Sequence, residues 1–316
     1  MRISTQSFYD QSRTAMGAQQ SNLLRVQQQL GAGTKILAPS DDPLGATRAL
    51  AVSQSIALNA QYSASRAQAT HNLILEDGAL QSVTSVLQSI KTGVIEAGNG
   101  TMSDADRATI ATTLQSSLDQ LQGLANTDDG NGQFLFAGFK SGSAPFVLQA
   151  GSINYIGDQG QRLLQVDVTR QMAGTDDGRS IFQALQGGAV YVGAAGADMF
   201  SAISDVITAL RTPVDNAGPA AQAQLQTALS IGNKNITNAH DNVLTVRASV
   251  GSRLQELDAL TVTGDSRTLY DKSYLSDLQD LDYAGAMAEF YQRQTALQAS
   301  QQTFVKIQQI ALFNYL

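Results

Sequence analysis

The distribution of proline constrains the fold of this chain more than any other feature. Among its 316 residues there are five prolines, Pro39, Pro43, Pro145, Pro213 and Pro219. Proline removes a backbone hydrogen bond and clashes with the preceding helical turn, so the proline-free stretches 44–144 and 220–316 can form long helices. Between them lies a Gly-rich segment with clustered Phe and Tyr. We therefore expect a mainly α fold, a long antiparallel helix or coiled-coil bundle built from both chain ends, with a small inserted β domain.

The N-terminal segment carries a heptad repeat. One heptad position is occupied by Tyr9, Met16, Leu23 and Leu30, and its companion position by Ser12, Gln19 and Val26. An apolar stripe beside a small or polar one makes a weak coiled-coil seam. Such a helix is marginal in water by itself.

The C-terminal segment has the same design. One position carries Tyr283, Phe290, Leu297, Phe304 and Ala311, and the companion position carries Met287, Gln294, Gln301, Gln308 and Tyr315. We expect the two chain ends to pair with each other or with copies of themselves. Because buried Gln needs hydrogen-bond partners, the seam is expected to be complete only in an assembly. The alternative is two ordinary amphipathic surface helices.

Further elements are predicted along the chain. Asp42 as N-cap and Pro43 at the first helical position begin a helix over 44–97, and a third helix runs from about 103 to 124. A strand or hairpin is expected at 134–138, and strands at 146–148, 153–156 and 163–168, with a Gly-bounded turn before the last. Helices are expected again near 199, over 220–260 and from about 273.

These elements predict three domains. Residues 1–40 and 281–316 form a terminal coiled-coil domain. Residues 41–139 and 201–280 form a helical bundle with a β-hairpin. Residues 140–200 form the inserted β domain.

The composition argues against chemistry at a catalytic or metal site. The chain has no Cys and two His, so thiol nucleophiles and Cys-based zinc or iron–sulfur ligation are excluded and acid–base or metal chemistry has little support. Only 15% of residues are charged, while 35 are Gln, and a net charge of −7 argues against nucleic-acid binding. The acidic pairs, among them Asp41-Asp42, adjoin Pro or Gly and are interpreted as caps and turns. We expect no catalytic residue, metal or cofactor.

Other sequence signals are weak or absent. No stretch approaches the 18 or more apolar residues of a membrane span, and the N-terminus lacks the apolar core of a cleaved signal peptide. We expect no membrane insertion. Asn99-Gly100-Thr101 and Asn235-Ile236-Thr237 fit the N-glycosylation pattern, which often arises by chance, so no function is assigned to them.

Several motifs carry a resemblance to a known family. They are Leu30-Gly31-Ala32-Gly33-Thr34-Lys35, Ser40-Asp41-Asp42-Pro43, Phe134-Leu135-Phe136-Ala137-Gly138, Tyr155-Ile156-Gly157-Asp158 and the ending Leu312-Phe313-Asn314-Tyr315-Leu316. In this order they resemble the flagellin family, and within it the proteins of the hook–filament junction. A Gly31-Ala32-Gly33 run stands where the family commonly has Ser-Gly.

The resemblance implies an axial structural protein rather than an enzyme. Its terminal helices would be disordered until assembly. Copies would form a ring-like layer between the first hook–filament junction protein and flagellin, outside the cell, after passage through the type III export apparatus with an export chaperone. The alternatives are a short flagellin, and a secreted enzyme or adhesin on the same scaffold. For the latter, 140–200 offers neither His nor Cys.

Overall fold

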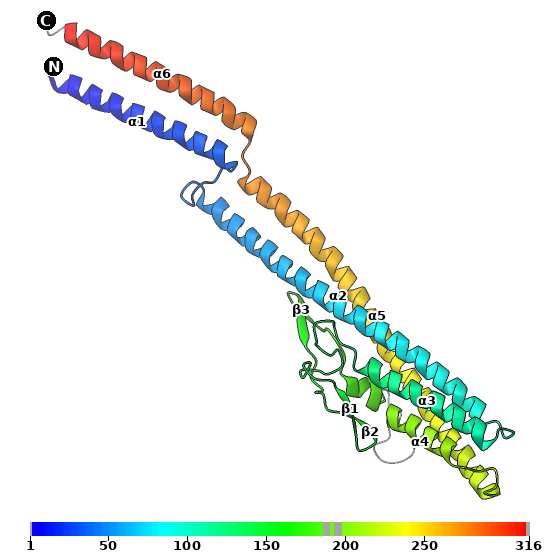
Figure 1. Ribbon diagram of the computed structural model, residues 1–316. Helices are drawn as coiled ribbons and strands as arrows, with labels where there is room; N and C mark the ends of the chain where they lie inside the picture. The colour runs from blue at the N-terminus through cyan, green and yellow to red at the C-terminus, as the bar shows by residue number, and fades with distance from the viewer. Residues whose placement is uncertain (1, 186–189, 193–197, 314–316) are drawn as a thin grey trace. The chain divides into compact units, whose positions relative to one another are not determined.

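The computed structural model describes residues 2–185, 190–192 and 198–313 (Figure 1). Its helices are α1 (Arg2–Ala32), α2 (Pro43–Ala97), α3 (Asp104–Ala125), α4 (Met199–Arg211), α5 (Pro219–Gln279) and α6 (Tyr283–Phe313), with a π-helical turn η1 (Arg179–Gln183). Its strands are β1 (Phe146–Gln149), β2 (Ser152–Tyr155), β3 (Leu163–Asp167) and β4 (Arg170–Ala173). The predicted mainly α fold with a small β insertion is confirmed.

The chain divides into two compact units. Unit 1 consists of residues 1–59 and 265–316, and unit 2 of residues 60–264. Both boundaries fall inside long helices, because α2 and α5 each contribute to both units. The three-domain division expected from the sequence stays a prediction.

The predicted helix starts rest on capping contacts. Asp42 Oδ1 accepts a hydrogen bond from Gly45 N at 2.9 Å, which begins α2 at Pro43 as expected.

The prediction for α5 and α6 was wrong, because α5 continues without a break to Gln279. The break comes at 280–282, where Asp282 Oδ1 accepts from Ala284 N at 3.1 Å and caps α6.

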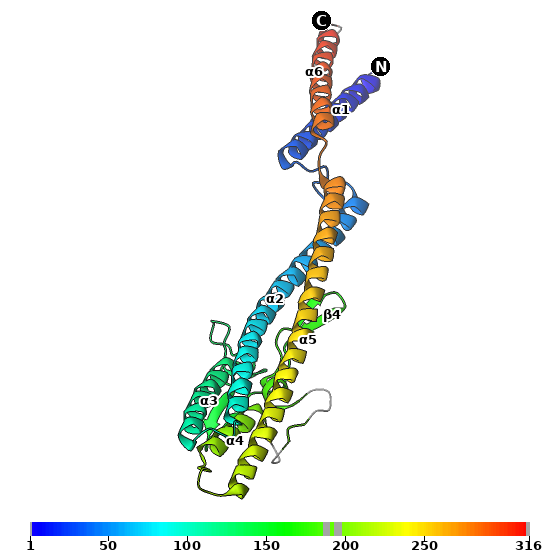
Figure 2. The same cartoon turned by 90° about the vertical axis from the view of Figure 1, so that its right-hand side faces the viewer.

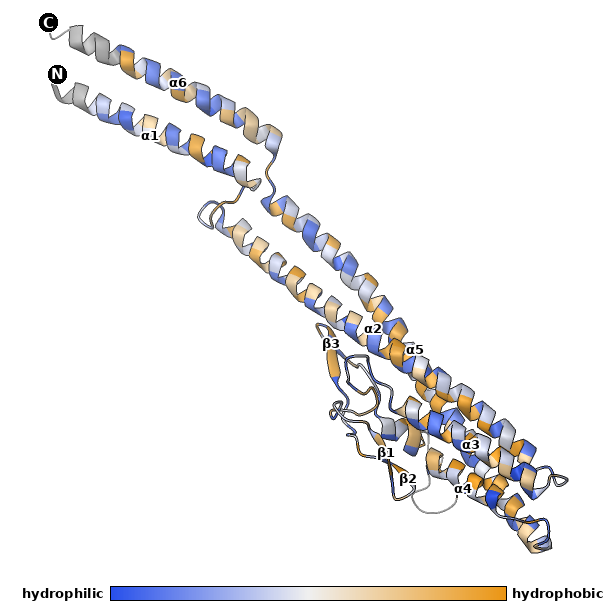
Figure 3. Cartoon of the chain, in the orientation of Figure 1, coloured by the Kyte–Doolittle hydropathy of each residue, from blue (hydrophilic) through white to orange (hydrophobic). Residues whose placement is uncertain are grey.

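Unit 2 contains the hydrophobic core. Figures 1 and 2 show α2, α3 and α5 side by side, and Figure 3 shows apolar residues concentrated where they pack with α4. The two heptad positions of α2 are buried throughout at Leu73, Leu80, Val83, Leu87, Ile90, Val94 and Ala97. A ring cluster formed by Phe136, Phe146, Phe182 and Phe200 joins the β segment to these helices. Most of the buried apolar side chains described therefore lie in this unit.

The β segment consists of two antiparallel hairpins. β1 pairs with β2 through the tight turn at Ala150 and Gly151, both at positive φ, and β3 pairs with β4. The three predicted strands are present, while β4 was not predicted because it has no apolar alternation. The strand expected at 134–138 is wrong. Phe134 forms one isolated bridge with Asp128, and the apolar run reflects burial in turns.

Candidate assembly interface

The N-terminal seam lies where the heptad predicts it. All seven of its residues are at least partly covered, namely Tyr9, Ser12, Met16, Gln19, Leu23, Val26 and Leu30. Val26 alone among them is fully buried, at 4% exposed. The Tyr9 ring meets Phe304 of α6 edge-on with centroids 6.0 Å apart, so the covering partner is α6 of the same chain. Figures 1 and 2 show the two helices as neighbours.

The C-terminal seam follows the prediction for one stripe only. Phe290, Leu297 and Phe304 are partly covered, whereas Tyr283 is 55% exposed. The side chains of Ala311, Gln308 and Tyr315 lie outside the described residues. Residues predicted as the companion stripe, Met287, Gln294 and Gln301, are exposed.

The residues that complete the α6 seam lie three positions after the first stripe rather than four. They are Ala286, Arg293 and Ser300. Both spacings adjoin the first stripe on a helix, so the heptad alone does not choose between them. Two of the three side chains are small, which allows close packing of α1, and Arg293 is held by Glu289 at 2.5 Å.

A second stripe on α6 therefore has no cover within the described part of the chain. It repeats at alternating spacings of four and three and consists of Met287, Tyr291, Gln294, Gln298, Gln301 and Val305. Its apolar members are 40%, 58% and 49% exposed at Met287, Tyr291 and Val305. Heptad spacing of apolar and Gln side chains is the pattern of a coiled-coil face. The same helix thus carries one occupied seam and one face that is open, which we call the vacant stripe.

The acidic motif builds the loop between α1 and α2. Asp41 Oδ2 accepts hydrogen bonds from Leu37 N and Ala38 N, both at 3.1 Å, and Asp41 pairs with Arg25 at 3.1 Å. The Ala38 N–H is the main cause that lowers the pKa of the Asp41 carboxyl, with Leu37 and Arg25 contributing. Ser40 is exposed, and Pro43 is the first residue of α2.

This loop is also tied to the link between α5 and α6. Lys35 N donates to Gln279 O at 2.8 Å, and Leu281 N donates to Gly33 O at 3.1 Å. Gly33 adopts a φ of 71°, and a Cβ there would stand 2.8 Å from the Tyr283 hydroxyl oxygen. Glycine is therefore favoured at this position. Sequence reasoning missed this contact, because nothing in the heptads links residues so far apart in the chain.

The described residues offer little for catalysis. No three His, Asp or Glu side chains in this part of the chain are grouped so as to hold a metal ion. Within the same described segments, no helix is long and apolar enough to span a bilayer. What the geometry presents instead is a surface for helix packing.

Comparison with known proteins agrees with this arrangement. Residues 3–141 match the bacterial flagellin N-terminal helical region, and residues 233–316 match the bacterial flagellin C-terminal helical region. A chain that matches both helical regions and whose two terminal helices pair is a flagellin-type protein.

Relatives define the family more narrowly. Flagellar hook-associated protein 3 of Escherichia coli is 38% identical over 316 residues, covering 99% of each chain, and that of Salmonella typhimurium is 38% identical with the same coverage. This chain belongs to the flagellar hook-associated protein 3 family, and it is a structural protein of the flagellum, an extracellular appendage. A crystal structure of flagellar hook associated protein-3 from Legionella pneumophila has the same fold, with a TM-score of 0.66 at 21% identity over 72% of this chain and 98% of that one. A short flagellin is less supported, because the two relatives named above, which align over 99% of their length, are hook-associated proteins.

Proposed function

We propose that copies of this chain form a ring-like layer at the hook–filament junction, between the first junction protein and flagellin. The vacant stripe of α6 is the observation that carries the proposal. Coiled-coil faces with exposed Tyr291, Met287 and Val305 are stabilised when another helix covers them. We assign that cover to terminal helices of neighbouring subunits, and we assign the seam residues Leu23 and Phe304 to the α1–α6 pair that presents the face.

Energetics support a terminal region that becomes ordered on assembly. Ordering a residue costs on the order of 1–2 kcal/mol in backbone entropy, which only buried area can offset. In the α1–α6 pair, Val26 and Ala286 are the fully buried apolar side chains among those described. We therefore expect α1 and α6 to be disordered in the free monomer and to fold against neighbours.

The proposed route and partners follow from the family. We infer export through the type III apparatus, assisted by an export chaperone. A chain without Cys makes no wrong disulfides in an oxidising exterior. We propose no enzymatic activity, cofactor, nucleic-acid partner or membrane insertion for this protein.

Two sets of substitutions test the assembly role in a strain deleted for the gene. Leu23→Asp and Phe304→Asp place a charge in the occupied seam, and Met287→Asp and Tyr291→Asp place one on the vacant stripe. Leu163→Asp, at a residue 57% exposed in unit 2, is the matched control. Filaments are counted by electron microscopy, and flagellin in the medium is measured.

We expect bare hooks with shed flagellin for the deletion strain and for both sets, and normal filaments for the control. Circular dichroism should show unit 2 folded in each variant. Normal filaments with Met287→Asp and Tyr291→Asp together would refute the role of the vacant stripe. Absence of both filament and shed flagellin in the deletion strain would identify the chain as flagellin instead.

A further inference from the structure

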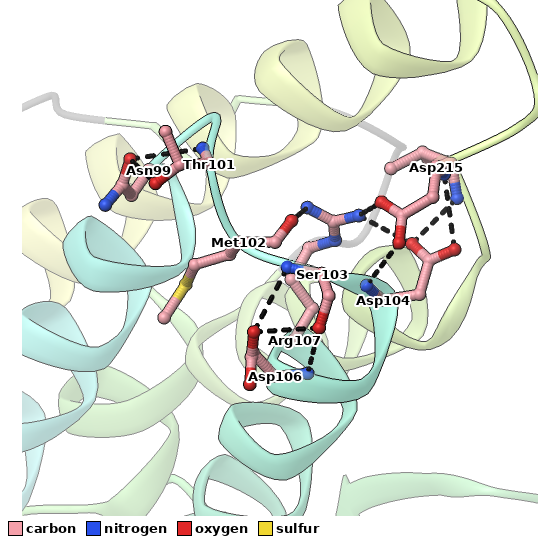
Figure 4. Close-up of polar contacts among 9 residues, drawn as sticks. Asn99, Thr101, Met102, Ser103, Asp104, Asp106, Arg107 and Asp215 are labelled. Carbon is pink, nitrogen blue, oxygen red and sulfur yellow. Dashed lines mark hydrogen bonds and ion pairs between the residues drawn. The ribbon is translucent and has the colours of Figure 1, made fainter.

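The turn between α2 and α3 contains an Asn side-chain amide that is exposed to solvent. Asn99 is exposed and is followed by Gly100, where an added Cβ would have no neighbour within 4 Å. Asn99 Oδ1 accepts hydrogen bonds from Thr101 N at 3.2 Å and from the Thr101 hydroxyl at 3.0 Å (Figure 4). These contacts turn the Asn99 side chain toward the residues that follow it. The Gly100 amide nitrogen is the next backbone nitrogen after Asn99, so its attack on Asn99 Cγ closes a five-membered ring.

We propose that Asn99 is a site of spontaneous deamidation. Gly100 N attacks Asn99 Cγ, and ammonia leaves with the side-chain nitrogen and the Gly100 amide proton, which closes a succinimide. Water then opens either carbonyl and leaves Asp or isoaspartate, so the net change is amide plus water to acid plus ammonia. The two donors of Thr101 stabilise the negative charge that develops on Oδ1 during the attack. Glycine at 100 removes the side chain that would hinder it.

A second Asn-Gly pair provides an internal comparison. Asn131, followed by Gly132, is also exposed, yet its backbone N–H donates to Asp129 Oδ1 at 2.9 Å, which is the main cause that lowers the pKa of the Asp129 carboxyl. A negative charge beside the amide disfavours a developing oxyanion. We therefore expect Asn131 to react more slowly than Asn99, although the local sequence is the same.

The second Asn-x-Thr motif, at Asn235, is expected not to react, because its side chain is buried and hydrogen-bonded. Asn235 is 2% exposed within α5, its Oδ1 accepts from Val192 N at 2.8 Å, and its Nδ2 donates to Val192 O at 2.7 Å. Both ends of this amide are occupied. Of the two Asn-x-Thr motifs, only the one at Asn99 is open to chemistry.

Deamidation of Asn99 would change a turn that side-chain contacts hold in place. Arg107 in α3 donates to Met102 O at 2.6 Å and pairs with Asp104 at 2.6 Å and Asp215 at 2.5 Å (Figure 4). These contacts join the start of α3 to the loop before α5. A carboxylate at 99 adds negative charge near the C-terminal end of α2, where the helix dipole disfavours it. Isoaspartate also lengthens the backbone of the turn. The fraction of chains that are deamidated at this turn would therefore increase with the age of the protein.

Ageing of the full chain in warm, mildly alkaline buffer tests the proposal, with peptide mass spectrometry separating Asn, Asp and isoaspartate at 99 and 131. We expect Asn99 to lose its amide faster than Asn131. Gly100→Ala should slow the reaction at 99 about tenfold, and Thr101→Val about fivefold through loss of one donor. Thr101→Ser should keep the original rate. Gly132→Ala is the control and should leave the rate at 99 unchanged.

Two results would overturn the proposal. The first is loss of the amide at Asn131 as fast as at Asn99. The second is an unchanged rate with Thr101→Val. Circular dichroism of each variant verifies that the turn is compared in folded protein.

Discussion

Both units are built from long helices, but they differ in how many apolar side chains those helices bury. Nearly every fully buried apolar side chain described belongs to unit 2, and unit 1 contributes only Val26, Ala49 and Ala286. Unit 2 packs segments of α2, α3, α4 and α5, two hairpins and a ring cluster around one core, whereas the terminal part of unit 1 has one helix pair. A single pair buries each helix on one side only. The difference leads us to expect that unit 2 keeps its fold in the free monomer, whereas the terminal pair of unit 1 gains stability when other helices cover it.

Among the described residues, exposed large apolar side chains occur in both units, but they are more frequent along unit 1, which is the shorter unit. Unit 1 exposes Leu24, Leu37, Leu44, Leu50, Leu58, Leu269, Tyr270, Tyr274, Tyr283, Met287, Tyr291 and Val305. Large apolar surfaces on a soluble chain mark sites of interaction. The contrast between the units can be tested by four measurements, given in order of decreasing size of the effect.

Amide hydrogen exchange should separate the units most strongly. Residues 9–30 and 284–306 are expected to exchange about a thousandfold faster than residues 73–97, because α1 and α6 open without unfolding of the core. Mass spectrometry of peptides from the free monomer measures this directly. Equal protection in both regions would show that the terminal pair is stable without neighbours.

Removal of a core ring should destabilise the protein far more than removal of a seam residue. Phe182 lies 5.2 Å from Phe146 and 5.5 Å from Phe136 between ring centroids, so Phe182→Ala should cost about 3–5 kcal/mol. Leu23→Ala, at a partly covered position, should cost less than about 1 kcal/mol. Urea unfolding followed by circular dichroism compares them. Similar losses would abolish the distinction between the units.

Glu76 makes the stability of unit 2 depend on pH. Its carboxylate is fully buried, burial raises the pKa of Glu76 to about 8, and the Asp176 carboxylate adds to the shift. The unfolded chain loses this proton near the ordinary glutamate pKa of 4.5, so the folded state holds more protons between these values. The free energy of unfolding should therefore fall as pH rises from about 4.5 to about 8.

Glu76→Gln removes this titration and keeps the shape of the side chain. The variant should be more stable than the parent at pH near 8, by on the order of 2 kcal/mol, and similar to it near pH 5. Urea unfolding at both pH values provides the measurement. An advantage that does not grow with pH would contradict the buried acid as its cause. Arg253 pairs with Asp176 and is left intact in this test.

The smallest effect is expected at the helix caps of unit 1. Asp42→Ala and Asp282→Ala each remove an N-cap and should cost about 1 kcal/mol. Exchange of the amides at 44–47 and 284–287 should accelerate accordingly, while the urea midpoint of unit 2 stays constant. Asp42→Asn retains the capping oxygen and serves as control. A shifted midpoint for unit 2 would show that the two units unfold together.

Helix α2 shows what a periodic pattern of apolar residues can predict. The α2 stripe from Leu73 to Val94 is both periodic and buried, and its start at Asp42 and Pro43 is encoded locally. The strand prediction at 134–138 failed, because a short apolar segment indicates burial and not strand pairing. The same ambiguity affected α6, where Ala286 is buried and Met287 is exposed.

The helices α2 and α3, the Asp42 cap, the N-terminal heptad stripe and the family could be predicted from the order of residues, because they depend on spacing over a few turns. Tertiary packing was needed to establish which stripe of α6 is covered, how Lys35 meets Gln279, and that Glu76 is buried beside Asp176. These features join residues far apart in the chain. Local periodicity places a side chain on a helix face, but the partner that this face meets depends on how distant segments pack.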